Sequence, residues 1–451
     1  MRPFAALGRW RGVETGERAA LRTFRAAARG AAGYQAHLAA HGIDPAAVSR
    51  LDEVPYTDKR SVFAGDIGRW ITGGRVTDAA ELLTSSGQSG LFSVGITSHA
   101  ERRAQERAID ATLRSLGAGE DGGTLLMNCL PMGISVPTGI ATVATPSVHV
   151  EVAVEMLVRA GAGFERVIIA AEPLFLKELG ETALHRHGPG FGERVVACFV
   201  GGEWVAESYR RYVSALFGFP ADARDRPGVL ISMGAAEAGL HLLTETPALR
   251  ATRARCEDPA GRQTLVGVDR GYTPSLFTWD ATRAHLEVRV HDDGVSTLVM
   301  TALGRRLMPL VRYDLDDEVD IIPADDFNAR LERLGLTVRV ETPVVAVWGR
   351  HRAPLAGDGW TLHPEAVKEL LFGTAAHAGA LTGRFRLRDS GGGPELHLQL
   401  RSGASPGPGL GITVADAASA AAGTRVTVFV HGYREYPYHE AGDFQHKPVY
   451  V

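Results

Sequence analysis

The segment Thr84-Ser85-Ser86-Gly87-Gln88-Ser89-Gly90 holds a dense group of residues that could bind phosphate. Glycines let backbone N–H groups approach a ligand closely, and serine and threonine hydroxyls add side-chain donors. The segment therefore suits a triphosphate. It is not a Walker sequence, because the GK[ST] ending is missing, and no G-x-S-x-G nucleophile elbow can be laid on it. Taken alone, such a segment is more often an ordinary loop.

Three later segments place small or acidic residues where we expect strands to end. Gly201-Gly202-Glu203 follows the apolar run 195–200, and the segment 234–239, Gly-Ala-Ala-Glu-Ala-Gly, follows the run 229–233. The third is Arg312-Tyr313-Asp314-Leu315-Asp316-Asp317. Ligands of parallel α/β sheets bind at the C-terminal ends of strands. Singly, the acidic run reads as a solvated turn and Glu237 as a helix cap, so the order of the segments carries the argument.

In that order and spacing, the four segments resemble the core motifs of the adenylate-forming superfamily of acyl-CoA synthetases, adenylation domains and luciferases. The similarity is to the branch of phenylacetate-CoA ligases and coenzyme F390 synthetases, and it runs from about Leu83 to the end of the chain. The resemblance implies an enzyme that uses ATP and Mg²⁺ to activate a carboxylic acid as an acyl-AMP, with release of pyrophosphate. By family default, the thiol of CoA then accepts the acyl group.

The resemblance also implies a role for each matching residue. The residues expected to bind the nucleotide are Thr84, Ser85, Ser86, Gly87, Ser89, Gly90, Gly202, Glu203, Gly234, Ala235, Ala236, Asp317 and Arg350. Among them, Thr84–Gly90 would grip the β- and γ-phosphates, Gly202 and Glu203 would form the adenine-side wall, and Asp317 would accept hydrogen bonds from the ribose hydroxyls.

Two catalytic roles follow from the same resemblance. Glu237 would hold Mg²⁺, a hard cation that prefers carboxylate and phosphate oxygens. Lys447, in the closing segment Tyr436–Tyr450, matches a lysine that enters the active site during the first half-reaction. The chemistry needs such a group, because a positioned ammonium offsets the repulsion between the acid's carboxylate and the α-phosphate.

Two positions depart from the family pattern. Ala236 stands where the family has Thr or Ser, so one hydroxyl near the α-phosphate is lost. Gly349-Arg350 resembles the hinge between two domains, but His351 and Arg352 follow where the family has an acidic residue. These departures leave a second interpretation open, that the protein is an inactive homologue which binds a nucleotide.

The acid is expected to lie in a mostly apolar pocket, which favours an aromatic or otherwise apolar acid. The pocket residues are Asn128, Pro131, Met132, Gly133, Ser232 and Met233. No motif selects the acceptor, so an amine acceptor (an amide-forming ligase) and a carrier-protein thiol remain alternatives to CoA.

The elements that must position these residues follow from hydrophobic periodicity. Apolar runs at 125–127, 167–171, 195–200 and 229–233 alternate with helical stretches, as in an α/β domain with largely parallel strands. The runs 285–290 and 297–302 flank Asp292-Asp293-Gly294 and predict a hairpin in a β-rich subregion. Helices are expected over 17–41, 98–116, 150–160 and 206–217.

We predict an α/β protein of two domains. A large multi-sheet N-terminal domain, residues 1–348, would bind ATP and the acid, and a smaller mobile α+β domain, residues 349–451, would carry Lys447. Helices at 364–371 and 414–421 and strands at 384–388, 395–400 and 425–430 are expected in the smaller domain.

The composition agrees with a globular protein that acts on a small-molecule substrate. The chain has 451 residues, 45% hydrophobic and 22% charged, with a formal net charge of -4 and no basic block, so nothing favours nucleic-acid or membrane binding. The first residues hold no apolar stretch of about 20 residues, which favours a cytoplasmic location. Cys129, Cys198 and Cys256 form no metal or disulfide pattern and are expected to be buried thiols. The sequence does not decide between a monomer and a homodimer.

Overall fold

The computed structural model describes residues 11–85, 87, 90–120, 122–220, 227–304, 306–351, 354–407, 409–438 and 443–451, with side chains from Gly16 onward. Ser86, Gln88 and Ser89 of the predicted phosphate loop lie outside these residues, as does Arg352. Within the described residues, none of the helices combines the length and apolar composition that a membrane span requires.

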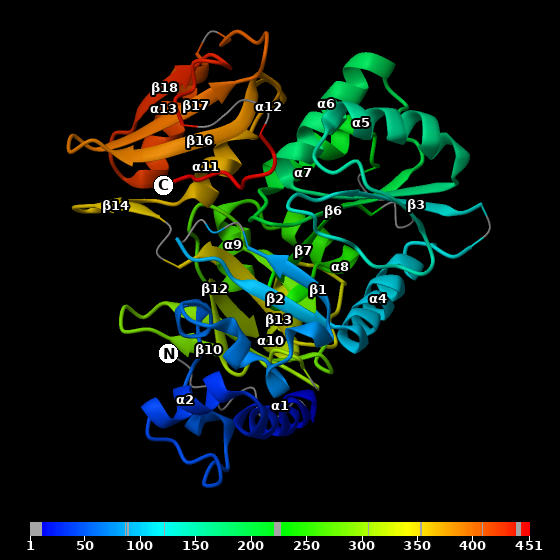
Figure 1. Cartoon of the computed structure of the whole chain (residues 1–451). Helices are drawn as coiled ribbons and strands as arrows, with labels where there is room; N and C mark the ends of the chain where they lie inside the picture. Colours follow the sequence, from blue (N-terminus) through cyan, green and yellow to red (C-terminus); the bar gives the residue numbers. More distant parts are fainter. Residues whose placement is uncertain are drawn as a thin grey trace.

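An eleven-stranded sheet forms the centre of the molecule (Figure 1), with the strand order β10-β11-β12-β13-β9-β8-β7-β6-β5-β3-β4. Strands β3 to β7 form the parallel half of the sheet. Every other neighbouring pair in the sheet is antiparallel. Their bounds are β3 Thr124–Cys129, β4 Thr142–Ala144, β5 Arg166–Ala171, β6 Val195–Val200, β7 Gly228–Ala235, β8 Gly239–Thr244, β9 Ser275–Trp279, β10 Ala284–Val290, β11 Ser296–Ala302, β12 Tyr313–Ile322 and β13 Val344–Arg350. The predicted alternation and the predicted hairpin are both confirmed.

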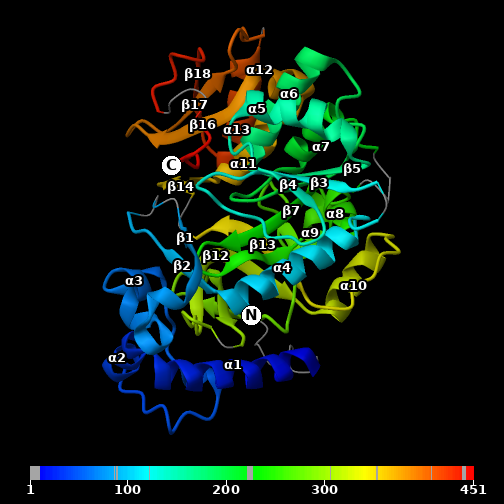
Figure 2. The ribbon, with the colours of Figure 1, turned by 45° about the vertical axis from the view of Figure 1, so that its right-hand side comes forward.

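Helices cover both faces of the parallel half, as its buried strands require. In two views, α5, α6 and α7 lie together above the strands, while α4 and α8 lie below them (Figures 1 and 2). Strand β3 is buried along its whole length, so its apolar run does not alternate. The helix bounds are α4 His99–Arg114, α5 Val150–Glu155, α6 Pro173–His187, α7 Glu207–Leu216, α8 Pro247–Ala254, α9 Pro259–Val266 and α10 Ala324–Arg333.

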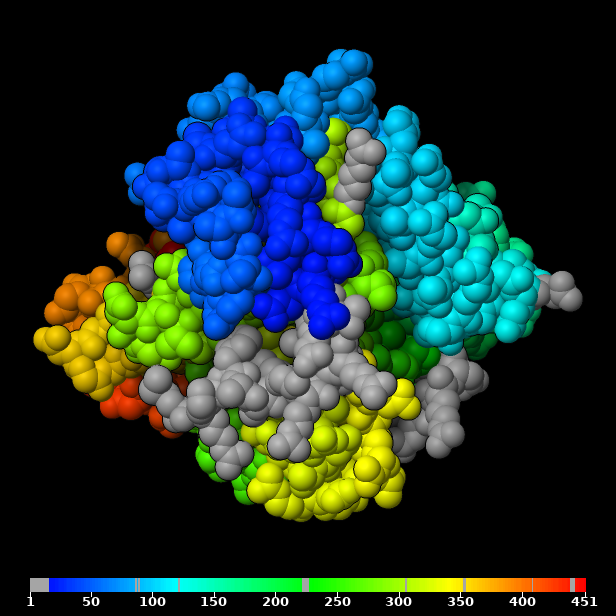
Figure 3. All heavy atoms as spheres, turned by 90° about the horizontal axis from the view of Figure 1, so that it is seen from below, coloured from blue at the N-terminus to red at the C-terminus, as the bar shows by residue number. Residues whose placement is uncertain are grey.

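The N-terminal segment packs on the antiparallel edge of the sheet. Helix α1, Arg11–Gly30, contacts β10 and β11, and Figure 3 shows this segment in blue covering that edge. The prediction of a single helix over 17–41 is wrong. The chain is extended at Ala31 (φ -117°, ψ 110°) and a second helix, α2, runs over Ala32–Ala40.

Two short elements of the first hundred residues connect this segment to the sheet. Helix α3, Lys59–Phe63, begins at a capping box of Asp58 and Ser61. Just before it, Thr57 pairs with Tyr313 at the start of β12. The strands β1, Ala79–Thr84, and β2, Val94–Ser98, form a separate antiparallel hairpin around the predicted phosphate loop.

The last hundred residues build a smaller α+β unit, and the predicted fold class is thereby confirmed. A three-stranded sheet in the order β16-β17-β18 carries the helices of this unit. Its elements are β14 Leu355–Gly357, β15 Trp360–Leu362, α11 Pro364–Leu371, α12 Ala375–Ala380, β16 Leu381–Asp389, β17 Pro394–Leu400, α13 Leu410–Ala422 and β18 Thr427–His431. Strand β13 continues to Arg350 within the large sheet, so the division proposed at residues 348 and 349 falls inside this strand.

All three cysteines are buried free thiols, as predicted. Burial raises the pKa of the Cys129 thiol to about 12. Such a thiol stays protonated near neutral pH and is a poor nucleophile.

Candidate active site

The loop after β6 meets the C-terminal segment of the chain. Lys447 donates a hydrogen bond from Nζ to the carbonyl oxygen of Gly202 at 2.8 Å. Gly202 has φ +97°, and a Cβ built there would lie 3.2 Å from Oε1 of Glu172 and 3.6 Å from Cε of Lys447. The left-handed backbone favours glycine here, and the contact with Glu172 leaves little room for a side chain.

Glu172 was not predicted as a site residue, but it lies beside Gly202 and Lys447. It follows β5 directly and is 6% exposed. Burial, reinforced by the negative charge of Glu203, raises the pKa of the Glu172 carboxyl to about 7, while Lys447 and Arg384 act in the opposite direction. The sequence did contain a signal, since an acidic residue at the C-terminal end of a parallel strand is a candidate ligand-site residue.

Asp317 lies close to Lys447 and is paired with Arg350. Nε of Arg350 is 3.3 Å from Oδ1 of Asp317, and Nη1 of Arg350 donates to the Leu315 carbonyl oxygen at 2.6 Å. Burial raises the pKa of Asp317 to about 6, and the Arg350 charge limits that rise. Although it makes both contacts, the Arg350 side chain is 59% exposed, so part of it remains accessible to solvent.

The predicted position of this segment at the C-terminal end of a strand is wrong. Residues 313–317 begin β12, which runs antiparallel to β13. Asp317 is paired in register with Arg350, the last residue of β13. Because the two strands run in opposite directions, the start of β12 lies at the same edge as the end of β13.

Glu237 occupies the hairpin between β7 and β8, where two hydroxyl groups fix its carboxylate. Ser93 donates to Oε2 at 2.7 Å, and Tyr313 donates to Oε1 at 2.8 Å. Each oxygen keeps a second lone pair, since an ionised carboxylate has about four acceptor sites. Within the described residues, no three His, Cys, Asp or Glu side chains gather to hold a metal. A single carboxylate still fits Mg²⁺, which usually binds through one or two carboxylates together with substrate phosphates.

The described part of the phosphate loop adjoins Glu237 through the β1–β2 hairpin. Thr84 is the exposed last residue of β1. The Ser93 backbone N–H donates to the Ser85 hydroxyl at 2.9 Å, so Ser85 binds its own hairpin in addition to any ligand. Gly87 and Gly90 have φ +70° and +77°, and the Gly90 N–H donates to the Gly87 carbonyl at 2.9 Å. This turn requires left-handed backbone, which explains both glycines.

Residues 234–236 lie directly against this hairpin. Gly234 is exposed within β7, and Ala235 ends the strand. A Cβ built on Gly95 of β2 would lie 1.8 Å from the Ala236 carbonyl oxygen. The backbones of the phosphate hairpin and of the Glu237 hairpin therefore touch, which sets the position of the loop relative to the carboxylate.

Lys59, at the start of α3, is a second residue that the sequence did not reveal. Burial lowers the pKa of its ammonium, whereas the negative charge of Glu237 raises it and the positive charges of Arg350 and Lys447 lower it. Lys59 is thus close enough to interact with all three predicted residues. The pairing of Thr57 with Tyr313 brings it there, and such a contact leaves no local pattern in the sequence.

The residues proposed for the acid pocket divide into two groups. Asn128, at the end of β3, uses its side chain locally, donating to the Ile134 carbonyl and accepting from the Leu130 N–H. In the loop that follows, Pro131 is buried, and Met132 and Gly133 have φ +58° and +69°. Met132 N–H donates to Oε1 of Gln445 at 3.2 Å, which joins this loop to the C-terminal segment. Ser232 and Met233 are half-buried in β7.

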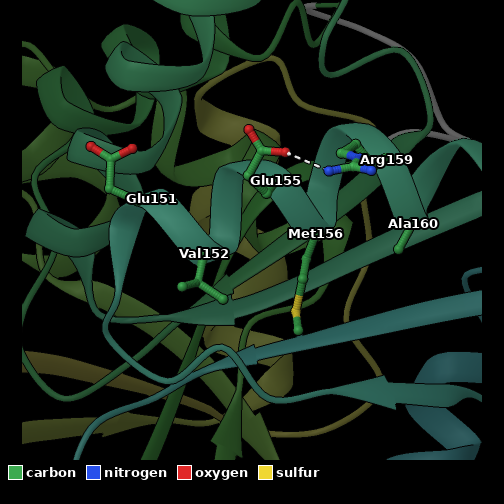
Figure 4. A pocket seen from close by; sticks show the side chains of 6 residues that line it. All are labelled: Glu151, Val152, Glu155, Met156, Arg159 and Ala160. Atoms are coloured by element: carbon green, nitrogen blue, oxygen red, sulfur yellow. Dashed lines mark ion pairs between the residues drawn. The ribbon is translucent and has the colours of Figure 1, made fainter.

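A hollow on the outer side of α5 is separate from these residues. It has a volume of about 400 Å³ and is lined by the one helical stretch 151–160 (Figure 4). Glu155 and Arg159 form an ion pair there, with 3.6 Å between Oε2 and Nη1. No predicted site residue lines it, so we place the candidate site at the strand ends instead.

The fold is that of the adenylate-forming CoA ligases. The chain superposes on 2-hydroxyisobutyryl-CoA ligase in the postadenylation state, bound to an acyl-AMP, with a TM-score of 0.65, 13% sequence identity and coverage of 92% of this chain and 86% of that chain. In the thioesterification state, the same ligase gives a TM-score of 0.53, again at 13% identity, with 95% and 87% covered.

A second ligase has the same fold. An anthranilate CoA ligase in complex with anthranoyl-AMP gives a TM-score of 0.53 at 13% identity, with 82% of this chain and 66% of that chain covered. No protein-family model matches the chain, and no curated protein matches it in sequence. The likeness therefore establishes the fold, and the chemistry must be argued from the residues.

Proposed function

We propose that the protein is an ATP-dependent ligase that activates a small carboxylic acid as an acyl-AMP and then transfers the acyl group, by default to the thiol of CoA. One observation carries the proposal, the convergence of the C-terminal Lys447 with Gly202, Asp317 and Arg350 at one edge of the sheet. The fold also supports the proposal, because a ligase of similar fold holds an acyl-AMP in a solved structure.

In the proposed first half-reaction, a carboxylate oxygen of the acid attacks the α-phosphorus of ATP. An O–P bond forms as the bond between the α-phosphorus and the bridging oxygen of pyrophosphate breaks. Lys447 would place its ammonium between the two anionic reactants. Burial lowers the pKa of that ammonium, and the carboxylate of Glu172 acts against this shift, which helps to keep the lysine charged. A preorganised charge in a partly desolvated site is worth far more than the same charge in water.

The nucleotide would be held from several directions. Asp317 and Arg350 would bind the ribose side, and Thr84–Gly90 together with Lys59 would face the phosphates. Glu237, already oriented by Ser93 and Tyr313, would hold Mg²⁺. When bound, Mg²⁺ neutralises charge on phosphate oxygens.

For the acid, we propose a small aromatic or otherwise apolar carboxylate. Half-buried Met233 and buried Pro131 supply the apolar surface of the proposed pocket. The similar folds belong to ligases for 2-hydroxyisobutyrate and anthranilate, which are small acids.

We also propose that the described arrangement is the one used for acid activation. The superposition is better on the postadenylation state than on the thioesterification state of the same ligase, with TM-scores of 0.65 and 0.53. Acyl transfer would require the smaller domain to turn away, so that Lys447 leaves Gly202 and opens a path for the acceptor.

The test is exchange of labelled pyrophosphate into ATP with Mg²⁺ and a panel of carboxylates. We expect exchange with at least one apolar acid, retained in Arg434→Ala, which removes an exposed cation just before the segment Tyr436–Tyr450, and lost in Lys447→Ala. ATP binding without exchange, both with and without added amine, would instead favour the inactive homologue. Product masses with CoA, an amine or a carrier protein then identify the acceptor.

A further inference from the structure

Glu203 was predicted to form the adenine-side wall. In the structure, its carboxylate accepts hydrogen bonds from two residues of the smaller domain. Its Oε2 accepts a hydrogen bond from Nζ of Lys368 at 2.5 Å and another from the phenol of Tyr450 at 2.6 Å. Lys368 belongs to α11 and Tyr450 is the penultimate residue of the chain. Two side chains of the smaller domain thus meet one oxygen of the large domain.

The ring of Tyr450 is seated in the smaller domain. It stacks on Phe385 with 4.4 Å between centroids, and Nζ of Lys368 lies 4.3 Å from its centroid. The Leu387 N–H of β16 donates to the Tyr450 carbonyl at 2.7 Å, so the end of the chain lies alongside β16. Only the phenol hydroxyl reaches across to Glu203.

Both partners of the contact between Glu203 and Tyr450 are close in sequence to the residues that hold the proposed catalytic lysine. Glu203 follows Gly202, whose carbonyl accepts from Lys447, and Tyr450 is three residues after Lys447. On the other side of the lysine, Phe444 packs edge-on against Phe175 of α6, with 5.4 Å between centroids. Lys447 is therefore held between two aromatic anchors, of which only Tyr450 forms a hydrogen bond to the loop that receives the lysine.

We propose that Tyr450 is a positioning residue, which locks the C-terminal segment onto Glu203 so that Lys447 reaches Gly202. This inference rests on the proposed function for the role of Lys447, but the contact itself is independent of it. Because the ring travels with the smaller domain and the carboxylate does not, the bond forms only when the two domains are arranged for acid activation.

The first test needs no substrate. Lys447 is labelled with acetic anhydride, and its modification rate is followed by mass spectrometry in the wild type, Tyr450→Phe and Tyr438→Phe. Tyr438 is the matched control, because its hydroxyl contacts Arg388 and His397 within the smaller domain. A lost hydrogen bond to a carboxylate should raise the labelling rate about tenfold in Tyr450→Phe, with no change in Tyr438→Phe. Equal rates in all three proteins overturn the proposal.

Should Tyr450→Phe fail to fold, Glu203→Gln tests the same bond, because a neutral amide binds the phenol and Lys368 less strongly. Pyrophosphate exchange by Tyr450→Phe gives a second readout, with kcat expected to fall about tenfold and KM for ATP unchanged. A labelling increase with unaltered kcat also overturns the positioning role. A wild type that never exchanges pyrophosphate refutes the proposed function instead, while the labelling result still decides whether Tyr450 anchors the segment.

Discussion

Gly95→Ala offers a clean test of how the phosphate hairpin is held against Glu237. Gly95 has no side chain where β2 touches the Glu237 hairpin, and an added Cβ would lie 1.8 Å from the Ala236 carbonyl oxygen. Non-bonded carbon and oxygen atoms are rarely closer than about 3.3 Å. The position of a Cβ is fixed by its own backbone and the oxygen is itself a backbone atom, so the two hairpins must separate by about 1.5 Å to accommodate one methyl group.

That separation is enough to break one of the two hydrogen bonds that orient Glu237, the one from Ser93. The Ser93 hydroxyl, two residues before Gly95, is 2.7 Å from Oε2 of Glu237, and a further 1.5 Å or so takes it beyond hydrogen-bonding range. A hydrogen bond to a charged group contributes about 1.5–3 kcal/mol. We therefore expect the affinity for ATP and Mg²⁺ to fall about 10- to 100-fold, with secondary structure retained.

The assay is titration with a fluorescent ATP analogue in the presence of Mg²⁺, alongside thermal unfolding and circular dichroism. Gly163→Ala is the matched control, because nothing lies within 4 Å of its added Cβ. The control should bind like the wild type. If Gly95→Ala also binds like the wild type, the contact between the two hairpins does not position the carboxylate and the reasoning fails.

Three further predictions concern other parts of the site. Lys447→Ala should lower pyrophosphate exchange about 10²- to 10³-fold while changing ATP affinity less than about threefold, and an equal loss of binding would contradict its catalytic role. Burial raises the pKa of Asp317 to about 6, so ATP affinity should weaken as pH falls from 7 to 5 and the carboxylate becomes protonated; in Asp317→Asn, affinity should already be weak at pH 7 and fall less between pH 7 and pH 5 than in the wild type, and a pH profile identical to that of the wild type would exclude this group. Gly349 has φ +144°, and its added Cβ would lie 2.5 Å from Oε1 of Glu365; Gly349→Ala should thus lower the free energy of unfolding by about 1–3 kcal/mol, and an unchanged urea midpoint would contradict this expectation.

Much of the fold was predictable because local patterns and tertiary packing agree. The runs at 195–200 and 364–371 predict β6 and α11 with their observed bounds. The break between α1 and α2 was not predictable, because it depends on packing against residues that are distant in the sequence. Gly33 lies so close to the Trp70 ring that a Cβ would approach it within 2.9 Å, and no periodicity in residues 17–41 signals that packing.

The site was predictable only as far as motifs and strand ends reveal it. The motif sufficed to propose Asp317 as a site residue, but its place on β12 depended on an antiparallel strand order that sequence does not encode locally. Lys59 and Tyr450 were missed for a related reason. Each reaches the site through a long-range contact, one through the pairing of Thr57 with Tyr313 and the other through the bond to Glu203.

The most direct measurement is a crystal structure of the protein with Mg²⁺ and a non-hydrolysable ATP analogue. The account predicts one nucleotide with its phosphates at Thr84–Gly90, its ribose at Asp317, a Mg²⁺ ligated by Glu237 and Lys447 beside the α-phosphate. A nucleotide bound elsewhere, or bound with Lys447 and Glu237 both distant from its phosphates, would contradict it.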